Sequence, residues 1–188
     1  VLDAVWDNQL APGAIDPARR SLLMKHKDPA IRDRATKLFA STAPNERTKV
    51  VAQYRPALEL TGDPKRGQQI FEQTCMTCHR IGNQGQEVGP NLATIQNRTP
   101  EALMIQILDP NREVLASYTQ YIAELKDERT VSGFIVSESP TSLTLKRAEG
   151  VEETILRQNI EDITSTSLSL MPEGLEQTIN HQQMTDLL

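Results

Sequence analysis

The stretch Cys75-Met76-Thr77-Cys78-His79 decides how this sequence is interpreted. It holds both cysteines of the 188-residue chain, separated by two residues and followed at once by a histidine. Two cysteines this close together close a loop too small to stabilise a fold. The pair therefore indicates chemistry at a site and not a structural cross-link.

The spacing is that of a covalent haem attachment sequence. Two thiols one helical turn apart can reach the two vinyl groups on one edge of a porphyrin, and the next residue then places its imidazole beneath the iron. A zinc site would need a fourth ligand from a distant part of a chain that has three histidines. A thioredoxin-type dithiol would lie between a strand and a helix, whereas this pair precedes a glycine-rich loop. We expect one haem c attached through Cys75 and Cys78, with His79 as an iron ligand.

The flanking residues resemble the haem-binding part of class I cytochromes c. Upstream, Gly67 and Phe71 precede the cysteines at the family's spacing, where glycine permits a close crossing by the last helix. Downstream, Gly89-Pro90-Asn91-Leu92 resembles the Gly-Pro-Asn/Asp-Leu element of the same fold. The resemblance implies that His79 is the proximal ligand, that its other ring nitrogen donates to the Pro90 carbonyl, and that Leu92 lies against the haem.

A second resemblance covers the chain from about residue 58 to its end. It rests on Leu60–Gly67, on the attachment sequence, on Ile107–Asn111, on the β-prone segment after it and on Ser169–Pro172. These segments are similar to the haem-binding domain at the C-terminal end of large planctomycete and verrucomicrobial proteins. Such proteins often carry a dehydrogenase-like β-propeller and HEAT-like repeats upstream. The resemblance implies an electron-transfer module of a larger oxidoreductase, with an upstream dehydrogenase domain or a redox protein as partner and without a catalytic site of its own.

The order of predicted elements suggests a mainly α fold with a β insertion. Helix starts are marked by Asp16-Pro17, Asp28-Pro29, Asp63-Pro64 and Thr99-Pro100, and Asn180 with Gln183 has the spacing of a capping box. Residues 43–46 indicate a break between helices, and Pro56 indicates an interruption within one. The β-prone runs separated by polar turns mark strands. We expect helices within residues 16–41, 48–60, 64–75, 99–108 and from 180 onward, a loop at 82–91, and strands at 118–125, 130–137, 143–147 and 154–157, with the chain leaving the sheet near Ser165.

This pattern divides the chain into three parts. Residues 1–57 form a helical preface, in which residues 28–35 resemble the second helix of a HEAT-type repeat. Residues 58–118 and 170–188 form a class I cytochrome c core, and residues 119–169 form an inserted antiparallel sheet or small barrel. The chain opens on Val and stops within its last helix, so we expect it to be either a processed protein or a segment of a longer polypeptide.

Seven side chains are candidates for the second axial position of the iron: Met24, His26, Met76, Met104, Met171, His181 and Met184. If the insertion returns the chain to the point where it left, the loop after the insertion must pass over the distal face. We therefore expect Met171 as the distal ligand, with Met104 as the second choice. Gap-filling core is the alternative role for Met171. A haem-based sensor or peroxidase-like domain with an open distal site is the alternative function, although no His–Arg pair lies near Met171 in the sequence.

Composition narrows the partners and the compartment. The net charge of −5 argues against a nucleic-acid binder, and no apolar run is long enough to insert this segment into a membrane. Aromatic residues make up only 4% of the chain, which a large aromatic cofactor would compensate. Because haem c is attached outside the bacterial cytoplasm, we expect a periplasmic protein, although the segment shows no signal peptide.

Overall fold

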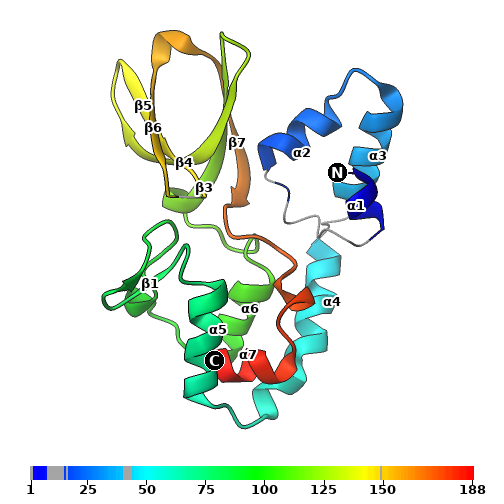
Figure 1. Cartoon of the computed structure of the whole chain (residues 1–188), viewed down its shortest axis with the longest axis vertical. Helices are drawn as coiled ribbons and strands as arrows, with labels where there is room; N and C mark the ends of the chain where they lie inside the picture. Colours follow the sequence, from blue (N-terminus) through cyan, green and yellow to red (C-terminus); the bar gives the residue numbers. More distant parts are fainter. Residues whose placement is uncertain (1, 8–14, 16, 40–43, 149) are drawn as a thin grey trace.

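A computed structural model describes residues 1–188 except 1, 8–14, 16, 40–43 and 149. Helices α1 to α3 lie together, α4 to α7 form a second helical body, and a five-stranded sheet stands beside both (Figure 1). The helices are α1 (Leu2–Trp6), α2 (Pro17–Met24), α3 (Pro29–Phe39), α4 (Pro44–Tyr54), α5 (Pro64–Thr74), α6 (Pro100–Leu108) and α7 (His181–Leu187). None of the described helices is long and apolar enough to cross a membrane.

Several helix starts follow from local capping chemistry. The Asp63 carboxylate accepts hydrogen bonds from the backbone N–H groups of Lys65 and Arg66, with Pro64 in the first turn of α5. The Thr99 hydroxyl accepts from Ala102 N at the start of α6. Asn180 and Gln183 form the predicted capping box of α7. The Asp16 cap expected for α2 lies outside the described residues.

The main helical core joins four elements. Val51 and Tyr54 of α4 pack with Met104 and Leu108 of α6 and with Met184 of α7, and Ala57 and Ile179 complete the cluster. The α-helix α4 ends at Tyr54, and a 3₁₀ turn, η2 (Arg55–Glu59), carries the expected interruption at Pro56. Thus α4, which precedes residue 58, packs against α6 and α7. The domain boundary at residue 58 stays a prediction.

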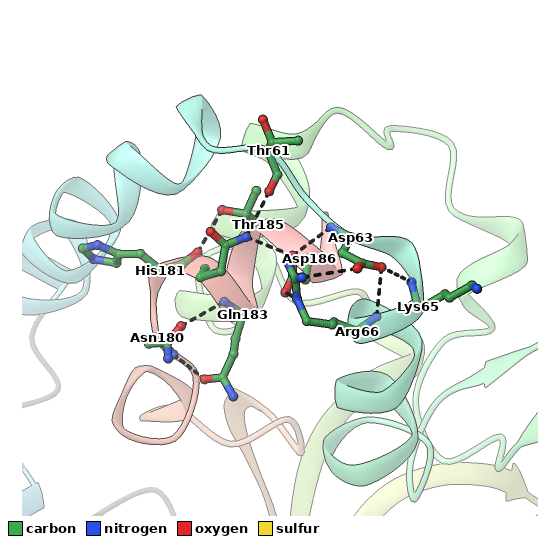
Figure 2. Close-up of polar contacts among 10 residues, drawn as sticks. Thr61, Asp63, Lys65, Arg66, Asn180, His181, Gln183, Thr185 and Asp186 are labelled. Atoms are coloured by element: carbon green, nitrogen blue, oxygen red, sulfur yellow. Dashed lines mark hydrogen bonds and ion pairs between the residues drawn. The ribbon is translucent and has the colours of Figure 1, made fainter.

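Helices α5 and α7 cross at Gly67, with almost no space between their backbones. A Cβ atom at Gly67 would lie 1.8 Å from Asp186 O. Beside this crossing the Asp186 side chain, only 1% exposed, accepts hydrogen bonds from Asp63 N and from the guanidinium of Arg66 (Figure 2). The glycine is needed because any side chain would push one backbone off the other.

The sheet is antiparallel throughout and runs in the order β6-β5-β4-β3-β7. Its strands are β3 (Thr119–Leu125), β4 (Thr130–Glu138), β5 (Ser142–Lys146), β6 (Glu152–Leu156) and β7 (Ile160–Ser169). Apolar side chains of one face form a core of Ala123, Leu125, Val131, Leu143, Leu145 and Ile155. In the register of β3 with β7, Thr119 pairs with Ser169, so the chain leaves the sheet beside the point where it entered.

Three expectations need correction. The chain does not leave the sheet near Ser165, because β7 continues to Ser169 and pairs with β3. Residues 82–91 are not loop throughout, since β1 (Arg80–Ile81) and β2 (Gln84–Gly85) form a short hairpin. Glu46 lies within α4 and not in a break between helices. A five-stranded sheet stands beside the described helices, so "mainly α" describes the fold only in part.

Candidate cofactor site

The attachment sequence forms a tight turn at the C-terminal end of α5. His79 N donates to Cys75 O at 2.8 Å, which places the imidazole one turn beyond the first thiol. Val88 N and Gly89 N both donate to Cys78 O, at 3.0 and 2.7 Å, and draw the following loop back under the turn. The two cysteines are half-buried and are not joined in a disulfide.

The His79 ring is oriented by the loop at residues 88–91. His79 Nδ1 lies 2.9 Å from Pro90 O, the contact that the resemblance implies. Since a carbonyl oxygen can only accept, Nδ1 carries the proton and Nε2 keeps its lone pair. Gly89 lies against the same ring, because a Cβ there would be 2.5 Å from His79 Cε1.

The thiol chemistry differs from that of a redox dithiol. Burial, and next the neighbouring Cys78, raise the pKa of the Cys75 thiol to about 11. Reactive dithiols of the thioredoxin type have a lowered pKa instead. Among the described residues there is also no group of three or more His, Cys, Asp and Glu side chains placed to hold a metal ion. The raised pKa of Cys75 therefore gives the redox-dithiol alternative no support.

Two neighbouring hairpins border the attachment turn. In the β1–β2 hairpin, Gly85 has a φ of +92°, and a Cβ there would lie 2.1 Å from His79 O. Arg80 stabilises this hairpin through Glu87, at 3.2 Å. From the sheet, the turn between β5 and β6 reaches Cys78, whose Sγ lies 3.9 Å from Ala148 O. Sequence reasoning missed Gly85, because its place in β2 opposite Arg80 is set by the pairing of the hairpin and not by a local turn pattern.

The other candidate residues are placed by separate contacts. Leu92 is half-buried at the start of a 3₁₀ turn that Asn91 caps. Met171 is half-buried in the loop between β7 and α7, and its backbone N donates to Ser169 Oγ at 3.0 Å. Within the described part of the chain no hydrogen bond joins Met171 to His79, and the distal position stays a prediction.

Comparison with known families agrees with the geometry of this turn. Residues 64–132 match the family model for Cytochrome c. The match runs from α5 through the attachment turn and α6 into β4, and it supports a c-type cytochrome domain in this part of the chain. No curated protein matches the chain at a significant level.

The Cytochrome c match implies a covalently bound haem c, with Cys75 and Cys78 as the attachment pair. The residues present fit this group. Two thiols that form no disulfide would provide the attachment, and the imidazole held at Nδ1 by Pro90, with Gly89 against its ring, would provide one axial ligand. When bound, haem c supplies a one-electron ferric/ferrous couple. The bond between His79 and Pro90 fixes the tautomer and the ring plane, so the ligand needs no reorientation.

Proposed function

We propose that this chain is the electron-transfer cytochrome domain of a larger oxidoreductase, with His79 as proximal and Met171 as distal axial ligand. The observation that carries the proposal is the 2.9 Å contact between His79 Nδ1 and Pro90 O, which leaves Nε2 as the ligand atom. An iron with histidine and methionine on its two faces has no open position, which suits electron transfer and not substrate turnover.

The structure gives most competing side chains another role. Met104 and Met184 are 0% exposed within the helical core. Met76 lies under the β1–β2 hairpin, with its Cγ 3.1 Å from the position of a Cβ at Gly85. His181 stacks edge-on against Tyr54, with ring centroids 4.6 Å apart, and His26 Nδ1 accepts from Asp28 N. Met24 lies in α2, among the first three helices.

The course of the chain favours Met171. Because Thr119 pairs with Ser169, the sheet returns the chain to the helical body at the point where it left. Met171 comes two residues later, on a loop that leads past α6 toward α7 (Figure 1). A loop can turn a thioether toward a ligand more freely than a packed helix face can.

The test is substitution with spectroscopy of the haem-loaded protein. Met171→Ala should abolish the weak far-red charge-transfer band of the ferric form, lower the reduction potential and let ferrous iron bind carbon monoxide. Met104→Ala is the control and should keep all three properties. An unaltered spectrum in Met171→Ala would contradict the ligand assignment, and carbon monoxide binding by the wild type would favour the sensor or peroxidase-like alternative.

We further propose that the electron donor is a dehydrogenase-like domain, either upstream in the same polypeptide or in a redox partner, and that the domain works in the periplasm. The support is chemical, since haem c is attached outside the bacterial cytoplasm. Expression with and without an export signal tests the compartment. Covalent haem should form only on exported protein, and its formation on cytoplasmic protein would contradict the proposal.

A further inference from the structure

The loop that carries Met171 is tied on both sides to a single side chain, Asn111, just beyond the end of α6. Asn111 Oδ1 accepts from Ser169 N at 2.8 Å, and Asn111 Nδ2 donates to Glu173 Oε1 at 2.5 Å. The two contacts lie two residues before and two residues after Met171. Asn111 therefore spans the loop as a bridge, although 58 and 62 residues of sequence separate it from its partners.

A buried ion pair strengthens the same junction. The guanidinium of Arg47 donates to Leu108 O, at the C-terminal end of α6, and to both carboxylate oxygens of Glu176. The side chains of Arg47 and Glu176 are only 10% and 18% exposed. Burial lowers the pKa of Arg47, but the hydrogen bond and charge of Glu176, with the charges of Glu173 and Asp109, raise it above its ordinary value overall. The end of α6 and the segment after Met171 are thus joined electrostatically as well.

One buried atom shows that the contact to Asn111 matters for Glu173. Glu173 Oε2 is buried and has no hydrogen-bond partner among the described residues. The other oxygen of this carboxylate, Glu173 Oε1, accepts a hydrogen bond from the side-chain amide of Asn111. A buried carboxylate that loses its donor carries a larger desolvation cost, so the loop is expected to move outward when Asn111 is removed.

We propose that Asn111 is a positioning residue that holds the Met171 loop against the haem. The inference rests on the proposed function, because it takes Met171 as the distal ligand. Displacement of a methionine ligand by an external ligand requires the loop to move, and the two bonds of Asn111 oppose that motion. Asn111 binds the backbone N–H of Ser169, and the Ser169 hydroxyl in turn accepts from Met171 N. Asn111 thus orients the backbone of Met171 through Ser169.

The test measures how readily imidazole replaces the distal ligand in the ferric haem-loaded protein. Loss of two hydrogen bonds, one of them to a carboxylate, should raise the apparent affinity of Asn111→Ala for imidazole about tenfold or more. Its far-red band should also disappear at a lower temperature than in the wild type. The matched control is Asn159→Ala, an exposed asparagine in the turn between β6 and β7, which should behave as the wild type.

A double variant that exchanges the donor and acceptor roles of residues 111 and 173 separates positioning of the Met171 loop from a general loss of protein stability. Asn111→Asp keeps an acceptor for Ser169 N but sets two carboxylates against each other, and it should bind imidazole as readily as Asn111→Ala. Adding Glu173→Gln restores the hydrogen bond with the roles exchanged, because the new amide at position 173 donates to the new carboxylate at position 111. The double variant should recover the far-red band and most of the resistance to imidazole. The double variant also keeps the inference testable if Asn111→Ala does not fold.

The outcomes distinguish the two proposals. If Met171→Ala removes the far-red band while Asn111→Ala binds imidazole like the wild type, the ligand assignment stands and the positioning role is wrong. The positioning role is also wrong if Glu173→Gln rescues only the melting temperature and not the imidazole affinity. If Met171→Ala keeps the band, both proposals fail together.

Discussion

Thr119 pairs with Ser169, so the first residue of β3 and the last residue of β7 lie opposite each other in the sheet. This relationship lets β3 to β7 interrupt the helical body without displacing the segment after them. That segment begins where α6 and its loop end, and it leads within a few residues to α7. The insertion is long in sequence, but its two ends lie side by side. The 92 residues between His79 and Met171 therefore do not speak against Met171 as the proposed distal ligand.

Gly89→Ala should disturb His79, the proposed proximal ligand. A Cβ at this position would lie 2.5 Å from His79 Cε1, so the ring must tilt and its hydrogen bond to Pro90 O must lengthen. We expect a changed ferric spectrum and a loss of about 1–3 kcal/mol in the free energy of unfolding. Gly82→Ala is the control, because Gly82 has a φ of +58° but nothing within 4 Å of its Cβ position. Equal spectra for both variants would contradict the role of Gly89.

Gly67→Ala should separate α5 from α7. The added methyl would lie 1.8 Å from Asp186 O, and a backbone carbonyl cannot move as a flexible side chain can. We expect the free energy of unfolding in urea to fall by about 3 kcal/mol or more. Gln68→Ala, at an exposed position of the same helix, should change it by less than about 0.5 kcal/mol. A Gly67→Ala protein as stable as Gln68→Ala would show that the two helices do not cross there.

Met104→Ala should cost stability and leave the haem spectrum unchanged. The side chain is 0% exposed among Leu108, Val51 and Met184, and its removal leaves a cavity. The expected loss is about 2–5 kcal/mol in the free energy of unfolding. Chemical denaturation together with the ferric absorption spectrum checks both halves of the prediction. A lost far-red band with normal stability would assign the distal position to Met104 instead.

Asp186 makes stability depend on pH. The hydrogen bonds from Arg66 lower the pKa of this carboxyl by more than burial raises it, and those from Asp63 N and Gln182 lower it further (Figure 2). The pKa of Asp186 is therefore well below its ordinary value. A carboxyl with a depressed folded-state pKa stabilises the fold above its unfolded pKa, near pH 4, and this contribution is lost as the pH falls further.

The wild type should therefore be more stable than Asp186→Asn at pH 7, and the difference should shrink progressively below about pH 4. Urea unfolding midpoints of the two proteins between about pH 7 and pH 2.5 measure this difference. A difference that stays constant across the range would show that the charge of Asp186 contributes nothing. Glu72→Gln, at an exposed position on α5, serves as the control and should show no such change.

Local chemistry explains which elements can be predicted from the sequence. Asp63-Pro64, Thr99-Pro100 and Asn180 with Gln183 each satisfy the first backbone donors of a helix without help from distant residues, and the structure confirms the helix at each place. The attachment turn is equally predictable, since its two thiols and its imidazole lie within five consecutive residues.

Distant pairing explains why other elements cannot be predicted in this way. Residues 161–169 of β7 are mostly serine, threonine and acidic residues without regular apolar alternation, and only the ladder with β3 makes them a strand. Asn111 stands out in the sequence only as part of a resembling segment. Its bridge to Ser169 and Glu173 depends on the return of the sheet to its starting point, which no local pattern encodes.

The order of the strands leaves β6 and β7 as the two open edges of the sheet. An open edge offers unpaired backbone groups to any extended chain, including a second copy of this protein. Exposed carboxylates stand on both, Glu152 on β6 and Glu161 and Asp162 on β7. A strand added at either side would have to strip water from these charges. The sheet thus carries its own protection against fibril-like stacking, and neutral substitutions at these positions would be the first to make concentrated samples aggregate.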